Sequence, residues 1–200
     1  MSNITIPIIL LAGQKFSGKT TVAKYILSKV PNSIELTFAS RLKSACKAIF
    51  NLSDKQLEDQ EEKKTIDTRW NITPREMFQV VGDLLRDYLP TLSPNLKIEY
   101  GTILTSGIAN DIFMLQKSNN PPSLIIISDG RLPDEYKLVK SFKNNIALRI
   151  EREEFKNNDT HKTEQVNFDT DLVIRNDGSL QELYIQIDKF IDKLKEIAFL

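Results

Sequence analysis

Residues 13–20 have the sequence Gly-Gln-Lys-Phe-Ser-Gly-Lys-Thr, which is a complete phosphate-binding loop pattern. The segment before it, residues 6–12, is short, apolar and free of charge, which predicts a buried parallel strand. The segment after it places Val22, Ile26 and Val30 at helical spacing. A strand, a glycine-rich turn and a helix start therefore follow one another in the order that an anion-binding βα unit requires.

The loop pattern carries its own phosphate-binding chemistry. Backbone N–H groups of such a loop point inward, and the N-terminus of the following helix adds partial positive charge. In this pattern the Lys19 ammonium reaches the outer phosphates, and the Thr20 hydroxyl ligates Mg²⁺. The sequence therefore predicts a nucleoside triphosphate site with Mg²⁺, formed by Gly13, Ser17, Gly18, Lys19, Thr20 and Thr21.

Length and charge limit the remaining classes of protein. The chain has 200 residues, which suits a single domain over residues 1–200. It carries 27 basic and 27 acidic residues, so no bulk charge attracts polymeric nucleic acid or an anionic membrane. Cys46 is the only cysteine, which favours a reducing compartment, and no apolar run reaches the length of a membrane span. We expect a cytoplasmic protein with no membrane partner and no nucleic-acid polymer as partner.

Strand-like and helical segments alternate along the chain. This order predicts an α/β fold, a three-layer P-loop NTPase with a parallel five-stranded sheet and helices on both faces. Residues 58–64 are predicted as a solvated helix, and the polar, aperiodic residues 151–168 as a loop or mobile lid. The predicted strands are residues 6–12, 33–38, 124–127, 146–150 and 172–174, and the predicted helices are residues 21–30, 41–50, 73–85, 103–115, 134–142 and 179–194.

Ligands in such folds bind beyond the carboxyl ends of the strands. Asp129 and Arg131 follow the strand at residues 124–127, where the carboxylate could hold Mg²⁺ or a substrate hydroxyl and the guanidinium could clamp an anion. The alternative is a turn with a surface ion pair, which we consider the weaker interpretation. Lys43, soon after the strand at residues 33–38, is equally consistent with anion binding and with a solvated helix face.

Three further polar side chains are candidates. Arg75 and Gln79 lie one turn apart on a helix that is otherwise apolar on that face, which favours binding. Arg152, at the start of the lid segment, is placed to cover a transferring phosphate. His161 is the only histidine and has no cysteine or histidine near it in sequence, so we expect neither a zinc site nor a catalytic base there.

The absence of a convincing general base indicates the reaction type. An acceptor that is itself a phosphate needs no base, because its oxygen is already an anion. The protein must then bring two polyanions together and neutralise the developing charge. The chain also lacks a guanine-reading Asn-Lys-x-Asp motif, which weighs against a GTPase switch. The residues expected to carry transfer are Lys15, Lys19, Arg131 and Arg152.

An ordered set of segments carries a family resemblance across nearly the whole chain. Together with the phosphate loop, the set resembles the viral and phage-type deoxynucleoside monophosphate kinases of the P-loop nucleoside monophosphate kinase superfamily. The segments are residues 38–43, residues 73–76 with Gln79 and Gly82, residues 128–131 with Glu135, residues 160–164, and residues 173–179.

The resemblance implies an enzyme that phosphorylates deoxynucleoside monophosphates of the dTMP, dGMP or dCMP type, with ATP and Mg²⁺. It implies a nucleoside-monophosphate-kinase-like fold, with a lid at about residues 151–168 and a monophosphate-binding helical region at about residues 41–115. A viral protein of this kind would act in the host cytoplasm. By position, the implied ATP site includes Lys19, Thr20 and Asn176, the implied metal ligands are Thr20 and Asp129, and the implied substrate site comprises Lys43, Arg75, Gln79, Asp129, Arg131 and Glu135.

Two other functions remain open at this point. Animal-type phosphomevalonate kinase is similar in its loop, in its Ser-Asp-x-Arg turn and in its final strand–Asn–Gly–helix, so a phosphorylated small molecule is an alternative acceptor. A nucleotide-binding module without transfer activity is the non-enzymatic alternative. We also hypothesise a homodimer formed through residues 87–115.

Overall fold

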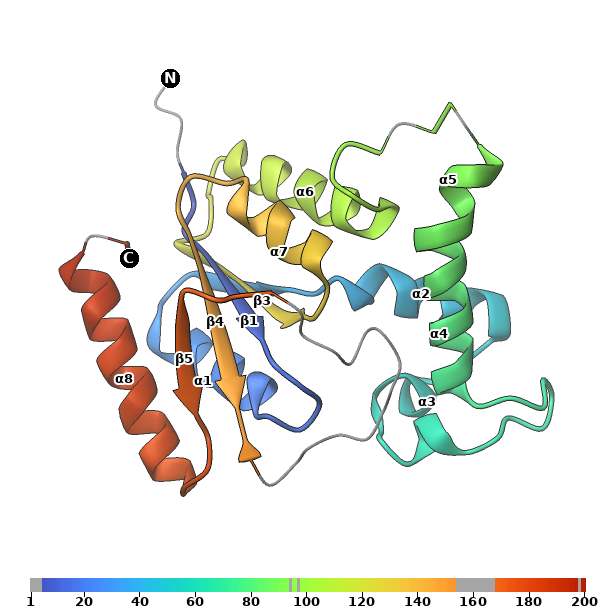
Figure 1. Ribbon diagram of the computed structural model, residues 1–200, viewed down its shortest axis with the longest axis horizontal. Helices are drawn as coiled ribbons and strands as arrows, with labels where there is room; N and C mark the ends of the chain where they lie inside the picture. The colour runs from blue at the N-terminus through green and yellow to red at the C-terminus, as the bar shows by residue number, and fades with distance from the viewer. Residues whose placement is uncertain (1–4, 94, 97, 154–167, 198) are drawn as a thin grey trace. The chain divides into compact units, whose positions relative to one another are not determined.

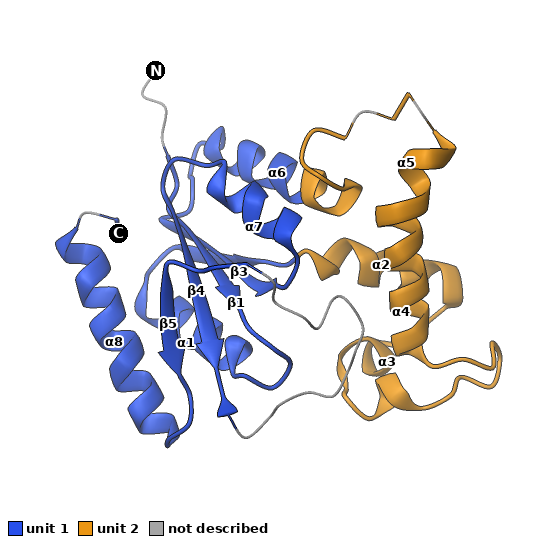
Figure 2. Ribbon diagram, in the orientation of Figure 1, with its two compact units in different colours: residues 1–37, 108–200 blue, residues 38–107 orange. Residues whose placement is uncertain are grey.

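The computed structural model describes residues 5–93, 95–96, 98–153, 168–197 and 199–200. The chain divides into two compact units (Figure 2). Residues 1–37 and 108–200 form the first, here called the sheet unit, and residues 38–107 form the second, the helical unit. No helix of the described residues has the length and apolar character needed to cross a membrane.

The sheet unit is built on five parallel strands in the order β2-β3-β1-β4-β5 (Figure 1). The strand that precedes the phosphate loop, β1, is central, so the loop leaves the sheet at the middle of its carboxyl edge. A parallel five-stranded sheet with helices on both faces was predicted, and this prediction is confirmed. The strands are β1 (Ile8–Ala12), β2 (Ser33–Leu36), β3 (Leu124–Gly130), β4 (Asn145–Glu151) and β5 (Leu172–Arg175).

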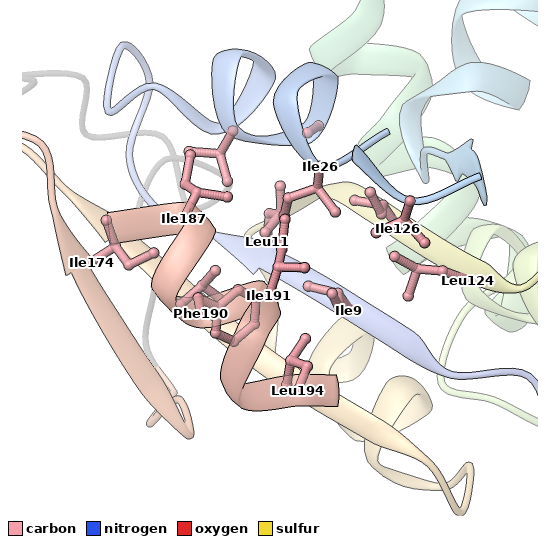
Figure 3. Packing of buried hydrophobic residues seen from close by; sticks show 14 of the residues in the cluster. Ile9, Leu11, Ile26, Leu124, Ile126, Ile174, Ile187, Phe190, Ile191 and Leu194 are labelled. Carbon is pink, nitrogen blue, oxygen red and sulfur yellow. The ribbon is translucent and has the colours of Figure 1, made fainter. Parts of the chain in front are cut away.

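One face of the sheet packs against α1 (Lys19–Lys29) and α8 (Leu180–Glu196). Figure 3 shows Ile9 of β1 and Ile126 of β3 in this layer. Both side chains are fully buried, because both faces of a parallel sheet are covered. Ile187 of α8 lies in the same cluster. This apolar layer fixes where α1, and therefore the loop before it, begins.

The opposite face carries α7 (Pro133–Lys140), which contacts β1 and β4. The second half of α6 (Ile103–Gln116) belongs to this unit, and Phe113 packs on Phe142 with ring centroids 5.6 Å apart. Three layers result, helices–sheet–helices, as the alternating sequence pattern predicted.

A bulge interrupts the pairing of β1 with β3. Leu10 pairs with Ile127, but Ala12 pairs with Gly130, so two residues of β3 stand opposite the single residue Leu11. A Cβ on Gly130 would lie 2.6 Å from Cδ1 of the buried Leu10, so any larger residue beside β1 would force the Leu10 side chain to move. The apolar run had suggested a strand ending at Ile127. The structure extends β3 through the bulge to Gly130, and Asp129 therefore lies within the strand, where a bulge re-aims side chains.

The helical unit consists of helices and turns among its described residues, apart from one isolated antiparallel bridge between Asp67 and Ile72. Its buried core joins Leu42 and Cys46 of one helix to Met77 and Val81 of another. Burial raises the pKa of the Cys46 thiol to about 11, which makes it unreactive. The elements are α2 (Ala39–Phe50), α3 (Asp54–Glu58), η1 (Glu62–Lys64), α4 (Pro74–Asp83), η2 (Leu84–Tyr88), α5 (Leu89–Leu92) and the start of α6.

Two details of this unit differ from a simple reading of the sequence. Residues 58–64 are not one helix, because the Asp59 carboxylate accepts hydrogen bonds from the N–H groups of Glu61 and Glu62 and turns the chain before the short 3₁₀ helix η1. The helix capped by Thr73 changes to π geometry over Leu84–Tyr88. Pro90 comes two residues after Tyr88, and a wider turn reduces the clash between a proline ring and the preceding carbonyls.

Candidate nucleotide site

The phosphate loop turns between β1 and α1 with three residues at positive φ. Gly13 has φ 146°, Phe16 has φ 66° and Gly18 has φ 106°. A Cβ on Gly13 would lie 2.4 Å from the Ile150 carbonyl oxygen and 2.8 Å from Ser17 Oγ. Both glycines of the pattern are therefore required by the turn itself, independently of any ligand.

Lys19, the first residue of α1, folds back over the loop. Its Nζ donates hydrogen bonds to the carbonyl oxygens of Gly13 at 2.7 Å and of Gln14 at 2.8 Å, and the side chain is 8% exposed. The ammonium is therefore held at the loop, while the predicted contact of Lys19 with the outer phosphates stays a prediction. Lys15 lies at the tip of the loop, with its Nζ 4.9 Å from the centroid of the exposed Phe16 ring.

The N-terminus of α1 is arranged to accept an anion. Gly18 is the N-cap and has no side chain that could cap the first turn, and that turn contains no acidic residue. The partial positive charge of the helix end is therefore not offset from within the helix. Thr20 is exposed and Thr21 is half-buried. Ser17 Oγ is buried, and it has no hydrogen-bond partner among the described residues.

The loop is also held from the last strand. Asn176, directly after β5, donates from Nδ2 to the Ser17 carbonyl oxygen at 2.9 Å, in a buried contact between residues 159 positions apart. The resemblance implied a place near adenine for this residue. The structure directs its amide nitrogen to the backbone of the loop, a contact that no sequence pattern reveals.

Asp129 and Arg131 lie at the carboxyl end of β3, beside β1, and both are half-buried. Glu135 is 5% exposed, and its carboxylate accepts hydrogen bonds from the backbone N–H groups of Arg131 at 2.7 Å and Leu132 at 2.9 Å. Glu135 was predicted to bind substrate. These two bonds make it the N-terminal cap of α7, through which it orients the backbone at Arg131.

The two described ends of the predicted lid, residues 151–153 and Phe168, lie beside β4 and β5. Arg152 follows β4 and is half-buried, and the N–H of Glu153 donates to Asp177 Oδ1 at 2.8 Å. At the other end, Arg149 donates to the Phe168 carbonyl, and the Phe168 ring stacks on Tyr136 with centroids 4.9 Å apart. The lid prediction itself and His161 fall on residues 154–167, outside the described residues.

The remaining predicted substrate residues belong to the helical unit. Arg75 and Gln79 are both half-buried on α4, one turn apart as expected. Lys43 of α2 forms an ion pair with Glu58, whose two carboxylate oxygens lie 2.9 and 3.0 Å from its Nζ. All three residues therefore lie in the helical unit, and their positions are described only within it.

Sequence reasoning missed one polar cluster in the helical unit. The Asp67 carboxylate accepts from Nε and Nη2 of Arg69 and from Nε2 of Gln56, while Arg69 Nη1 donates to the Asn51 carbonyl. The hydrogen bonds from Arg69 first, and then from Gln56, hold the pKa of Asp67 well below its ordinary range. The signal was present in the sequence, since an aspartate that begins a turn often binds the backbone two residues later, as Asp67 does with the Arg69 N–H.

A central parallel strand, a phosphate loop with its lysine and an uncapped helix N-terminus define a P-loop nucleotide-binding protein. The fold agrees with that of TT1252 from Thermus thermophilus, which superposes with a TM-score of 0.52 at 15% identity, over 96% of this chain and 99% of that one.

Sequence comparison identifies the family. Residues 106–187 match the family model "Deoxynucleotide monophosphate kinase". A protein of Acanthamoeba polyphaga mimivirus, named "Putative deoxynucleotide monophosphate kinase", is 37% identical over 196 residues, which cover 95% of this chain and 98% of the viral protein. The chain belongs to the deoxynucleotide monophosphate kinase family, as the ordered motifs predicted.

Proposed function

We propose that this protein transfers the γ-phosphate of ATP to a deoxynucleoside monophosphate and releases ADP and the diphosphate. The observation that carries the proposal is the intact phosphate loop, with Lys19 held at its carbonyls, in a chain related over 95% of its length to a viral protein of this family. Family membership also favours this acceptor over phosphomevalonate, and favours an enzyme over a nucleotide-binding module without activity.

The reaction requires charge neutralisation rather than proton abstraction. An acceptor phosphate oxygen is already an anion, so it attacks the γ-phosphorus as the bond to the β-phosphate oxygen breaks. Lys19 stabilises the transferring group from the loop, while Lys15, Arg131 and Arg152 supply further positive charge around it. Glu135 contributes indirectly, because its carboxylate fixes the Arg131 backbone.

The residues at the carboxyl edge of the sheet fit a magnesium ion. Thr20 offers an exposed hydroxyl at the start of α1, and Asp129 offers a carboxylate on the bulged end of β3, next to β1. Hydroxyl and carboxylate oxygens are the ligands that Mg²⁺ prefers in phosphoryl-transfer sites. A bound Mg²⁺ would offset negative charge on the triphosphate.

In this proposal, residues of the helical unit bind the deoxynucleoside monophosphate. Arg75 and Gln79 share one face of α4, so a guanidinium and an amide can bind the same phosphate or base. Lys43 would have to exchange its ion pair with Glu58 for a substrate phosphate, at little cost because surface ion pairs contribute little stability. We expect a base of the dTMP, dGMP or dCMP type, and a cytoplasmic location.

An acceptor panel tests the function. Purified protein with ATP and Mg²⁺ is given dTMP, dGMP, dCMP, dAMP or phosphomevalonate, and ADP release is measured. We expect ADP only with one or more of the deoxynucleotides. ADP release with phosphomevalonate alone would establish the rival acceptor, and tight ATP binding with no turnover on any acceptor would establish a nucleotide-binding module.

An exposed apolar stripe supports the hypothesis of a homodimer. Val80, Leu84, Tyr88 and Leu92 follow one another at four-residue intervals along α4, η2 and α5, and they are 47–73% exposed. We assign this apolar stripe, which partly overlaps residues 87–115, to contact with a second copy of the chain. Light scattering should give a dimer mass that falls to the monomer mass in Leu84→Asp. Ile185→Asp, at an exposed position of α8, is the matched control and should leave the mass unchanged.

A further inference from the structure

The hydrogen bond between Asn176 and Ser17 joins the last strand to the phosphate loop. Asn176 Nδ2 lies 2.9 Å from the Ser17 carbonyl oxygen, and the two residues are 8% and 3% exposed. A buried hydrogen bond of this length is not exchanged with water, so it fixes both partners. It therefore restrains the loop at the peptide that precedes the helix.

That peptide also carries the N–H of Gly18. In a trans peptide the C=O and N–H are coplanar and point in opposite directions. Holding the Ser17 carbonyl toward Asn176 consequently directs the Gly18 N–H away from β5. Inward-pointing N–H groups are what a phosphate-binding loop uses to hold an anion. The direction of one loop donor thus depends on a side chain at the other end of the chain.

On the loop side, the Asn176 side chain lies too close to Gly18 for any side chain at that position. A Cβ on Gly18 would lie 2.5 Å from Asn176 Nδ2 and 3.5 Å from its Cγ. The side chain of Asn176 therefore occupies the space that any other residue at position 18 would need. Gly18 is required here both for its φ of 106° and for the close approach of the amide.

Asn176 is itself fixed by the sheet. Its backbone N–H donates to the Glu151 carbonyl at 2.7 Å, which continues the pairing of β5 with β4 beyond Arg175. The next residue, Asp177, accepts from the Glu153 N–H. The amide is therefore presented to the loop from a rigid strand end, as a support for a binding site should be.

We propose that Asn176 is a positioning residue for triphosphate binding: by holding the Ser17–Gly18 peptide it orients the Gly18 N–H toward the phosphates. It acts through the loop backbone and needs no contact with the adenine base. This inference rests on the loop being the nucleotide site of the proposed function. It predicts that Asn176 matters for any polyphosphate, whether or not a base is attached.

Inorganic tripolyphosphate separates this role from an adenine contact, because it has phosphates and no base. Its dissociation constant and that of ATP are measured by calorimetry on the full-length protein and on Asn176→Ala, without any acceptor. We expect both constants to rise by about tenfold, the scale of one lost hydrogen bond in a binding site. In turnover, the KM for ATP should rise while the KM for the monophosphate stays unchanged.

Asn145→Ala is the matched control. Like Asn176, Asn145 donates a side-chain amide hydrogen bond to a backbone carbonyl, that of Phe142 at 2.6 Å. Asn145 lies at the amino end of β4, paired with Ile8 at the start of β1, whereas the phosphate loop follows the carboxyl end of β1. Its loss should lower the unfolding temperature without changing either dissociation constant. If Asn176→Ala does not fold, Asn176→Ser, which keeps a polar group but is too short to reach the loop, replaces it.

Two results would overturn the inference. Unchanged tripolyphosphate binding with weakened ATP binding would show that Asn176 contacts the base. Unchanged binding of both ligands, with only a lower unfolding temperature, would reduce it to a structural residue. Because neither measurement uses an acceptor, both remain informative if the acceptor panel fails.

Discussion

The two compact units are stabilised in different ways. In the sheet unit, all five residues of β1 are buried, and they join a large cluster in which strand residues pack on α1 and α8. In the helical unit the buried cluster is smaller, and the hydrogen bonds around the buried Asp67 carboxylate supplement it. Apolar burial dominates the first unit, and local polar contacts contribute more to the second.

The difference has a consequence for function. The phosphate loop starts from the most buried strand and is held by Asn176 from another, so its geometry is set before a ligand arrives. Arg75 and Gln79 stand on α4, whose buried residues include Met77 and Val81 of the smaller cluster. Regions with fewer buried apolar contacts have a lower free energy of local unfolding. We therefore expect a rigid donor site and a more easily opened acceptor site.

The largest expected effect tests the donor site. Lys19→Met should lower the rate of phosphoryl transfer by about 10²- to 10³-fold, because it removes a preorganised cation from the transferring phosphate. The methionine keeps an apolar chain of similar length but loses the two hydrogen bonds to the loop carbonyls, so the protein should still fold, with an unfolding temperature lower by a few degrees. Turnover with saturating ATP and the best acceptor of the panel is the measurement. A variant with full rate would contradict the assignment of the loop.

A pair of core substitutions tests the comparison directly. Ile126→Ala and Met77→Ala each leave a cavity at a fully buried position and should each cost about 3 kcal/mol. If the units differ as described, Met77→Ala raises amide hydrogen exchange within residues 38–107 while the strands stay protected. Ile126→Ala should raise exchange throughout. Equal exchange profiles for the two variants would show that the chain unfolds as one cooperative unit.

The same contrast explains what the sequence could predict. Strands buried on both faces give unbroken apolar runs, such as residues 124–127, and the loop and the Thr73 cap have fixed local patterns. The sheet, the place of the loop between a buried strand and a helix, and the start of α4 were therefore predictable. Of these segments, the loop and the one that begins at Thr73 also belong to the ordered set that carries the family resemblance.

What could not be predicted depends on contacts between distant residues. The bulge that carries Asp129 appears only when β3 is paired with β1, because register is a property of two strands. The bond from Asn176 to Ser17 spans 159 positions, and nothing near Asn176 in the sequence indicates it. The role of Glu135 as a cap, by contrast, has a local signal at the third position of α7, and it does not test the substrate role that the resemblance implied.

A smaller effect is expected at Asp67, and it tests whether polar contacts stabilise the helical unit. Asp67→Asn keeps the size of the side chain but weakens its bonds to Arg69, so the helical unit should unfold at a lower temperature at neutral pH. The pKa of Asp67 is lowered in the folded protein, so its charged form stabilises the fold above the unfolded pKa of about 3.9. That stabilisation is lost as pH falls below this value toward the folded pKa.

The difference in unfolding temperature between wild type and Asp67→Asn should therefore be largest near pH 7 and shrink below about pH 4. Circular dichroism melts at a series of pH values provide the measurement. A difference that stays constant down to acid pH would mean that the carboxylate charge does not stabilise this unit.

The smallest effects are expected from the two surface ion pairs of α2. Lys43→Ala and Lys47→Ala each remove one pair, with Glu58 and with Asp54, and each should change stability by less than about 1 kcal/mol. The two variants should differ in catalysis, since only Lys43 is predicted to bind the monophosphate. We expect a severalfold higher KM for the acceptor in Lys43→Ala and an unchanged one in Lys47→Ala. If both KM values stay unchanged, Lys43 serves only its pair with Glu58, and the acceptor site of the helical unit depends on α4 rather than on α2.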